Sequence, residues 1–349
     1  MTEYKPLRGT LTSKGNYKID PTAVIDVDNI NLGYDASIGP RTEIRGGTIN
    51  LGNNVSIGPD TRIKGREIHF GDRTLVDEFV RMNISEYFRT GKDSVLRGWS
   101  RFEGREIKGK HRFYMNYRSK IGGGDSFDPT AYLHAENWLH LGDGGEINTA
   151  RGVTIGREVA IGPNSKIYTH GAWGPLWEGF TDKWGPVKIG NFVWIPTNVT
   201  ISPDVTIGDY CKIARYSLIN IDIPAGTHAM GIPVSKHKNE WEINIYPRAI
   251  SKQEKENIIQ EIAKVSEERL YNENKIKHKL SVKNIEEDIY EIEGVTFNMN
   301  FPRIISGSVT EETKPLVEKF IDQARRKTFR FDFELDEKGK YVPYPALEN

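Results

Sequence analysis

A repeat with a period of six residues constrains this sequence more than any other feature. Across residues 32–76 an apolar residue recurs every six positions, in rows of nineteen residues. Two columns of the repeat read Leu32, Leu51, Phe70 and Ile38, Ile57, Val76. The pattern predicts coils of three short strands, each with one apolar side chain pointing inward and a tight corner after it, where glycine, asparagine or aspartate would supply positive φ. We expect a parallel β-helix, and the six-residue period favours its left-handed form.

The repeat continues into the second half of the chain. It runs from Leu141 to Ile167 and then steps by six through Ile189, Ile195, Ile201, Ile207, Ile213 and Ile219. Cys211 falls at a small position of this repeat, which predicts a buried core residue and not a nucleophile. Residues 77–138 lose strict phase, and the run Gly122-Gly123-Gly124-Asp125 indicates wider coils with outward loops. We assign them to the same solenoid, because cutting a stack would expose two apolar ends.

The repeat stops near Pro233, and a different pattern follows. Ser251 and Glu254 have the spacing of a capping box, and apolar residues then recur at helical intervals. We therefore predict a mainly β protein with three parts: a left-handed β-helix over 1–238, a helical linker over 239–284, and a small α+β module over 285–349.

Charge and cysteine content limit the kinds of partner and the cellular compartment that we expect. The 349 residues include 48 basic and 48 acidic side chains, so the overall charge gives no footprint for nucleic acid or anionic lipid. The single cysteine fits a reducing compartment, and no apolar stretch approaches the length of a membrane span. We expect a cytoplasmic protein without a nucleic-acid or membrane partner.

Three stretches then carry a resemblance to a known family. They read VTIGREVAIGPNSKIYTH from Val153, VKIGNFVWI from Val187, and IPAG from Ile223 followed by GIPVSK from Gly231. Residues 155–236 resemble the catalytic half of the hexapeptide-repeat acyltransferases, in the style of the maltose, galactoside and polysaccharide O-acetyltransferases. The resemblance implies a homotrimer that transfers acetyl from acetyl-CoA to a hydroxyl of a sugar-like or cell-envelope precursor, with no metal.

The resemblance also assigns a catalytic residue. In the family a histidine at the end of a coil, just before an extruded loop, acts as general base on the acceptor hydroxyl, and His170 occupies that position. A hydroxyl is too weak an acid to attack a thioester unaided at neutral pH, and histidine titrates in the range that suits a base. Asn148 aligns with an asparagine that contacts the acceptor in the family. The alternative is a structural asparagine that takes the left-handed conformation at a corner of the coil.

Further site residues follow for the acceptor and the donor. Trp173 and Trp177, in the loop after His170, are expected to stack on a sugar or to pin the loop to the solenoid. His134 and His140 would line the acceptor site or serve a structural role. By resemblance, the CoA contacts fall at Trp194, Ala214, Arg215, Asn220 and Lys236.

Two other classes of function stay open from the sequence. A γ-type carbonic anhydrase uses the same solenoid with histidines on adjacent coils, and His134 and His170 lie 36 residues apart, close to two coils. Zinc needs a third protein ligand, and Pro175 stands where that histidine would be expected. The other alternative is a non-catalytic trimeric binding module, which an intact His170 argues against.

Overall fold

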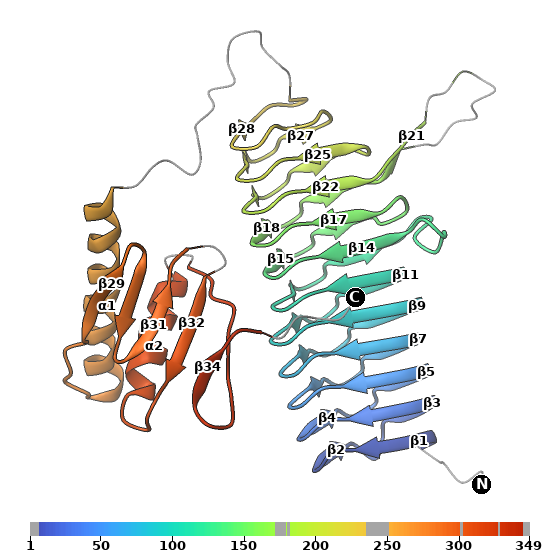
Figure 1. The fold of residues 1–349 in the computed structure, drawn as a ribbon. Coiled ribbons are helices and arrows are strands. Elements are labelled where there is room, and N and C mark those ends of the chain that lie inside the picture. The colour runs from blue at the N-terminus through green and yellow to red at the C-terminus, as the bar shows by residue number, and fades with distance from the viewer. Residues whose placement is uncertain are drawn as a thin grey trace. The chain divides into compact units, whose positions relative to one another are not determined.

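The computed structural model describes residues 7–171, 179, 182–234, 251–300, 303–326 and 329–344. These residues belong to two compact units, Met1–Pro247 and Arg248–Asn349 (Figure 1). The first unit is a stack of β coils, and the second combines helices with a sheet.

The first unit is a parallel β-solenoid built from two long sheets and one short ribbon. Its larger sheet contains, in chain order, β1 (Leu7–Ser13), β3 (Val24–Leu32), β5 (Glu43–Leu51), β7 (Arg62–Phe70), β9 (Arg81–Thr90), β11 (Arg101–Gly109), β13 (Lys120–Gly122), β14 (Tyr132–Ala135), β16 (Glu146–Ile147), β17 (Val153–Ile155), β19 (Lys166–Ile167), β22 (Val187–Ile189), β24 (Thr200–Ile201), β25 (Val205–Ile207) and β27 (Leu218–Ile219). The smaller sheet contains β2 (Tyr17–Ile19), β4 (Ala36–Ile38), β6 (Ser56–Ile57), β8 (Leu75–Val76), β10 (Val95–Leu96), β12 (Tyr114–Met115), β15 (Leu139–Leu141), β18 (Val159–Ile161), β23 (Trp194–Ile195), β26 (Lys212–Ile213) and β28 (His228–Ala229). The ribbon pairs β20 (His170–Gly171) with β21 (Lys183–Trp184).

Strands of successive coils pair in parallel, which confirms the predicted parallel β-helix. From β3 to β11 each long strand continues around one corner of the coil. In β5 and β11 the backbone bends at this corner at Gly46 and Gly104, which have φ of 134° and 156°. After β11 the larger sheet divides into two branches, one through β13, β16 and β19 and the other through β14, β17 and β22. The loop between β13 and β14 separates the branches, and an extra residue in β9, where Gly65 pairs with Ile84 but Glu67 with Tyr87, shifts the phase before it.

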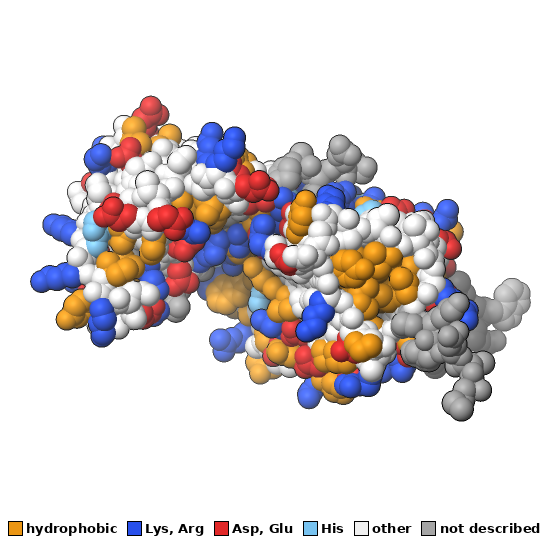
Figure 2. Space-filling view, turned by 90° about the horizontal axis from the view of Figure 1, so that it is seen from below, with side chains coloured by type: hydrophobic (Ala, Val, Ile, Leu, Met, Phe, Trp, Pro, Cys, Tyr) orange, Lys and Arg blue, Asp and Glu red, His pale blue; other side chains and the backbone are white. Residues whose placement is uncertain are grey.

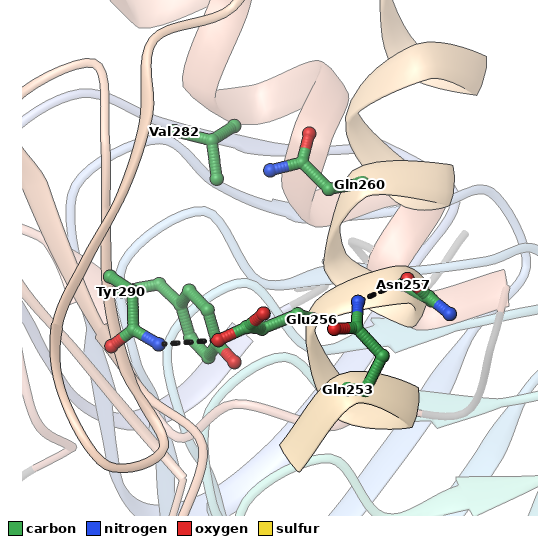
Figure 3. A pocket seen from close by; sticks show the side chains of 7 residues that line it. Gln253, Glu256, Asn257, Gln260, Val282 and Tyr290 are labelled. Atoms are coloured by element: carbon green, nitrogen blue, oxygen red, sulfur yellow. Dashed lines mark hydrogen bonds between the residues drawn. The ribbon is translucent and has the colours of Figure 1, made fainter.

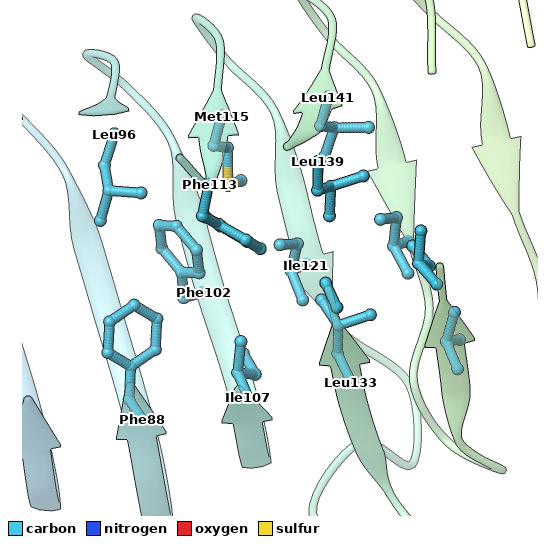
Figure 4. Close-up of a cluster of buried hydrophobic side chains, with 14 of the residues drawn as sticks. Phe88, Leu96, Phe102, Ile107, Phe113, Met115, Ile121, Leu133, Leu139 and Leu141 are labelled. Atoms are coloured by element: carbon cyan, nitrogen blue, oxygen red, sulfur yellow. The ribbon is translucent and has the colours of Figure 1, made fainter. Parts of the chain in front are cut away.

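The solenoid core is a column of inward apolar side chains. Where the repeat loses phase, phenylalanines fill the coil: Phe88, Phe102 and Phe113 are buried, and the rings of Phe88 and Phe102 meet edge to face with centroids 5.4 Å apart (Figure 4). Cys211 is 2% exposed, as predicted, and its thiol lies 3.1 Å from the carbonyl oxygen of Pro224. Burial raises the pKa of that thiol, so it stays protonated in the core.

The corners agree with the sequence prediction in part. Asp35 and Asn54 supply positive φ, both at 55°, whereas Gly33 and Gly52 of the repeat do not. The glycine after the apolar residue has another purpose: a Cβ on Gly33 would lie 2.4 Å from the carbonyl carbon of Gly52 on the next coil. These glycines are therefore needed because the backbones of stacked coils approach closely.

The first coil forms one end of the stack. Hydrophobic side chains gather on this end of the solenoid, seen from below in Figure 2. Leu7, Leu11 and Ile19 pack against the core but are only partly buried, because no described coil lies beneath β1 and β2. Within the described ranges, no helix of either unit has the length and apolar composition needed to cross a bilayer.

The second unit packs two helices with an antiparallel sheet. Its elements are α1 (Lys252–Asn274), β29 (Val282–Glu286), β30 (Ile289–Ile292), β31 (Val295–Asn298), β32 (Ile304–Ser308), α2 (Lys314–Arg326), β33 (Glu334–Leu335) and β34 (Lys340–Val342). The predicted capping box at Ser251 is confirmed, since its hydroxyl accepts from the Glu254 amide while the Glu254 carboxylate accepts from the Ser251 amide. We predicted a linker over 239–284, but α1 contributes Ile259, Ile262 and Leu270 to the core of this unit.

Candidate active site

His170 lies where the chain leaves the solenoid. Its strand β20 follows β19 at a corner of the coil and pairs antiparallel with β21, so that His170 lies opposite Trp184. This ribbon is the base of the loop that the sequence predicted after His170. Trp173 and Trp177, the predicted acceptor contacts in that loop, lie outside the described residues.

Asn148, from the preceding coil, fixes the orientation of the His170 ring. The Asn148 side chain is 5% exposed, and its Nδ2 donates to the carbonyl oxygen of Gly123 at 2.6 Å. Its Oδ1 accepts from the Thr169 hydroxyl at 2.5 Å and lies 3.1 Å from Nδ1 of His170. Because an amide oxygen can only accept, Nδ1 of His170 carries the proton. Nε2 is then the nitrogen with a free lone pair.

A glycine loop from the coil before Asn148 passes the edge of the imidazole. Gly123 and Gly124 have φ of 85° and 56°, in the left-handed region that glycine adopts at no steric cost. A Cβ on Gly124 would lie 2.7 Å from Cε1 and 3.2 Å from Nε2 of His170. The loop therefore leaves no room for a side chain on this side of the ring.

One face of the imidazole is covered by Trp184, and Arg151 contacts Trp184 in turn. The Trp184 indole stacks on His170, with ring centroids 4.9 Å apart and an interplanar angle of 21°. The guanidinium carbon of Arg151 lies 4.2 Å from the Trp184 ring centroid, and Nη1 donates to Asp128 at 2.8 Å. Packing against Trp184 restrains the imidazole, and the cation–π contact with Arg151 holds Trp184 in place.

The two other histidines predicted for the acceptor site have partners of their own. His134 lies on β14, with Nε2 2.5 Å from the carboxylate of Glu106 on β11. Burial raises the pKa of Glu106, but hydrogen bonds from His134 and Lys108 outweigh it and hold that pKa below its ordinary value. His140 lies on β15 of the smaller sheet, next to Asn116. The described contacts bring neither histidine to His170.

The predicted CoA contacts lie on other parts of the coil. Trp194, on β23 of the smaller sheet, is 49% exposed, and Nζ of Lys212 lies 4.9 Å from its ring centroid. Ala214 and Arg215 follow β26 at the next corner, and Arg215 is exposed. Asn220 follows β27, in the branch that also contains β16 and β19. Lys236 lies outside the described residues.

Sequence analysis missed several neighbours of His170. Gly123 and Gly124 could have been found from the glycine run, which we predicted only to form an outward loop. No sequence pattern marked Arg151 and Asp128 as neighbours of His170. The inserted loop between β13 and β14 makes this coil longer than the others, so the repeat does not show which residues lie above one another. Across the described ranges, no three His, Cys, Asp or Glu side chains gather in a way that could hold a metal ion.

A separate cavity of about 320 Å³ lies in the second unit (Figure 3). It is mostly polar and is lined by Gln253, Glu256, Asn257, Gln260, Val282, Asn284 and Tyr290. Glu256 accepts a hydrogen bond from Asn284 at 3.4 Å inside it. No residue that the sequence predicted for the site lines this cavity.

Comparison with known proteins identifies relatives of the solenoid. The family model for the bacterial transferase hexapeptide (six repeats) matches residues 186–220. The galactoside O-acetyltransferase of Escherichia coli is 30% identical over 136 residues, which are 37% of this chain and 67% of that enzyme. A putative acetyltransferase of Saccharomyces cerevisiae is 37% identical over 126 residues, 35% of this chain and 57% of the relative.

A solved structure is also similar to this chain. It is a hexapeptide-repeat acetyltransferase of Vibrio cholerae in complex with acetyl-CoA, with 26% sequence identity and a TM-score of 0.29. The match covers 34% of this chain and 62% of that one. The chain thus spans between 57% and 67% of the length of these three relatives.

Proposed function

The chain belongs to the hexapeptide-repeat acetyltransferases, and on that premise we propose that it transfers an acetyl group from acetyl-CoA to a hydroxyl of a sugar-like or cell-envelope acceptor. The observation that carries the proposal is the hydrogen bond between Asn148 and Nδ1 of His170. It leaves Nε2 as the proton acceptor of a ring that Trp184 covers on one face.

The reaction needs a base, and His170 is our candidate. Nε2 takes the proton of the acceptor hydroxyl while the oxygen attacks the thioester carbonyl of acetyl-CoA. The tetrahedral intermediate collapses with cleavage of the carbon–sulfur bond, and the departing thiolate takes the proton back from Nε2. The acceptor leaves as an acetyl ester and the donor as free CoA, so His170 ends in the state in which it began.

The surroundings of His170 support this role. Asn148 keeps the proton on Nδ1, so that every imidazole presents the same nitrogen to the acceptor. Trp184 covers one ring face, and the Gly123–Gly124 loop lies along the ring edge.

We propose that the donor site lies on the smaller sheet, at Trp194 and Arg215. Trp194 offers an exposed aromatic surface beside the Lys212 ammonium, and Arg215 offers an exposed guanidinium, which suits an adenine ring and its phosphates. His170 extends from the larger sheet, so one copy holds the base and the donor surface on different sheets. A neighbouring copy would bring them together, in a homotrimer with shared sites.

The first test follows release of free thiol when the purified full chain meets acetyl-CoA and a panel of simple and nucleotide-linked sugars. We expect His170→Ala to lower turnover about 10²- to 10⁴-fold, with little change in the affinity for acetyl-CoA. His69→Ala is the matched control, because His69 lies on β7 and pairs with Glu67 away from the site. Near-parental turnover in His170→Ala would remove it from the mechanism.

The second test addresses the shared site. Light scattering of the full chain should give about three times the chain mass of 39.7 kDa. A monomeric mass in an active preparation would contradict a site shared between copies.

A further inference from the structure

Four neighbouring strands carry a basic residue at the same outward-facing position. Arg62 on β7 lies directly opposite Arg81 on β9, Arg81 opposite Arg101 on β11, and Arg101 opposite Lys120 on β13. The three arginines are exposed and Lys120 is partly exposed. Figure 1 shows β7, β9 and β11 stacked one on the next. We name these four residues the basic track.

The basic track works against folding. Like charges directly opposite each other on neighbouring strands destabilise a sheet, and each of these residues has a like charge opposite it on at least one neighbouring strand. Other columns of the same solenoid pair opposite charges instead: Arg41 lies 2.6 Å from Asp60, and Arg73 lies 2.7 Å from Asp93. The fold therefore permits charge alternation between coils, and this column lacks it over four rungs.

Nearby carboxylates neutralise the track only in part. Arg62, Arg101 and Lys120 have acidic neighbours at 3.6, 3.8 and 4.0 Å, distances at the limit of an ion pair. Arg81 forms no ion pair with a described residue, and neither does Lys64, which lies exposed two positions after Arg62. Over β7, β9 and β11 this face therefore has a surplus of positive charge.

The track ends at the candidate active site. Lys120 begins β13, and the chain continues from it into Gly123 and Gly124, the loop beside His170. On the next rung Glu146 lies opposite Lys120, and Asn148 follows two positions later. A ligand lying along the track would therefore reach the imidazole at its end.

We propose that the basic track binds a linear acidic polysaccharide and delivers one of its hydroxyls to His170. Successive rungs are about 4.8 Å apart, close to the length of one sugar ring along an extended chain, so a polymer with one carboxylate per sugar could match the guanidinium groups. This inference rests on the proposed acyl transfer at His170 and names its acceptor class.

The composition of the face favours a glycan over single-stranded nucleic acid. Proteins that bind single strands stack the bases on aromatic side chains. The outward positions in the first halves of β5, β7, β9 and β11 carry no aromatic residue; they are Glu43, Arg45, Arg62, Lys64, Arg81, Asn83, Arg101 and Glu103. Charge and hydrogen bonding are the means of recognition available there.

The experiment measures binding of the full chain to fluorescent polygalacturonate by anisotropy, with dextran of equal length as the neutral probe. If four cations contact the polymer, raising the salt from 50 to 200 mM should weaken binding about 50-fold. For the double variant Arg81→Gln/Arg101→Gln, the same rise in salt should weaken binding only about 7-fold, because two cationic contacts to the polymer remain. We also expect at least tenfold weaker binding of this variant at low salt.

Controls separate the track from charge in general and from catalysis. Lys18→Gln/Lys188→Gln removes two exposed lysines on other strands and should bind like the parent. His170→Ala should also bind like the parent, so a failure of the proposed acyl transfer leaves this assay unchanged. A failure of the track would instead appear as absent polymer binding in an enzyme that acetylates small sugars.

Three results would overturn the proposal. Dextran could bind as well as polygalacturonate, or Arg81→Gln/Arg101→Gln could bind like the parent. A single-stranded poly(dT) of equal charge could also bind more tightly than polygalacturonate, which would indicate a nucleic-acid surface.

Discussion

Gly124 offers a test of how finely the His170 ring is positioned. In Gly124→Ala the new Cβ would lie 2.7 Å from Cε1 of His170, whereas ordinary contact begins at 3.4 Å, so the ring must retreat by about 0.7 Å. Displacements of about 1 Å in an active site can cost about 100-fold in rate, so we expect kcat to fall about 10- to 100-fold. The left-handed φ of 56° adds about 1–2 kcal/mol of strain for alanine. Steady-state kinetics of thiol release and urea unfolding measure the two effects.

Two other glycines separate backbone strain from displacement of the ring. Gly294→Ala has a similar φ of 80° with no atom within 4 Å of the new Cβ, so it should lose a similar amount of stability and keep its kcat. Gly171→Ala, next to His170, also meets no atom within 4 Å and should keep its kcat. Parental kcat in Gly124→Ala would refute the claim that the glycine loop positions the imidazole.

Three further predictions address other contacts of the solenoid. Asn148→Ala should lower kcat at least about tenfold with an unchanged KM for acetyl-CoA, because the Nδ1 proton loses its acceptor; a change in KM alone would contradict a positioning role. Arg81→Gln should raise the midpoint of thermal unfolding at low salt and leave it unchanged at high salt, where repulsion along the basic track is screened; a lower midpoint at both would indicate a structural role instead. The folded-state pKa of Glu106 is lowered, so its contribution to stability is present above about pH 4.5 and lost as the pH falls through the folded-state pKa. Glu106→Gln should therefore be less stable than the parent at pH 6, and the difference should shrink below pH 4.5; a constant difference in urea unfolding would contradict this.

The sequence predicted the solenoid because its repeat is a direct consequence of the coil. Each coil must place apolar residues inward at fixed intervals, so Ile38 and Ile57 recur in register and pair in the structure. The reason for the repeat glycines was harder to infer, because close approach between coils and positive φ both favour glycine. Only the stacked backbones show that Gly33 is needed for close approach, while Asp35 takes the left-handed conformation.

The site was predictable only in part, because its residues come from coils of unequal length. Asn148 and His170 are 22 residues apart and meet in the structure, and the family resemblance had singled out both. Gly124 lies on the far side of the inserted loop, where a count of nineteen residues per coil no longer applies. The stack of Arg151 on Trp184 depends on a ribbon that leaves the solenoid and returns, which a six-residue period cannot represent.

On our proposal the basic track gives the coils of β7, β9 and β11 a role in binding the acceptor. The described neighbours of His170 begin at Gly123, so the coils of β1 to β11 contribute nothing to the chemistry itself. Their inward residues only continue the apolar column, which any stack of coils would need. Their outward residues differ from those of a purely structural stack, because Arg62, Arg81 and Arg101 repeat one charge at intervals of 19 and 20 residues. Three rungs of about 4.8 Å carry that charge to Lys120, and a polymer bound along it would be held before its hydroxyl meets the base. On this proposal the coils of β7, β9 and β11 act on acceptor affinity, whereas the coils from Gly123 onward act on turnover.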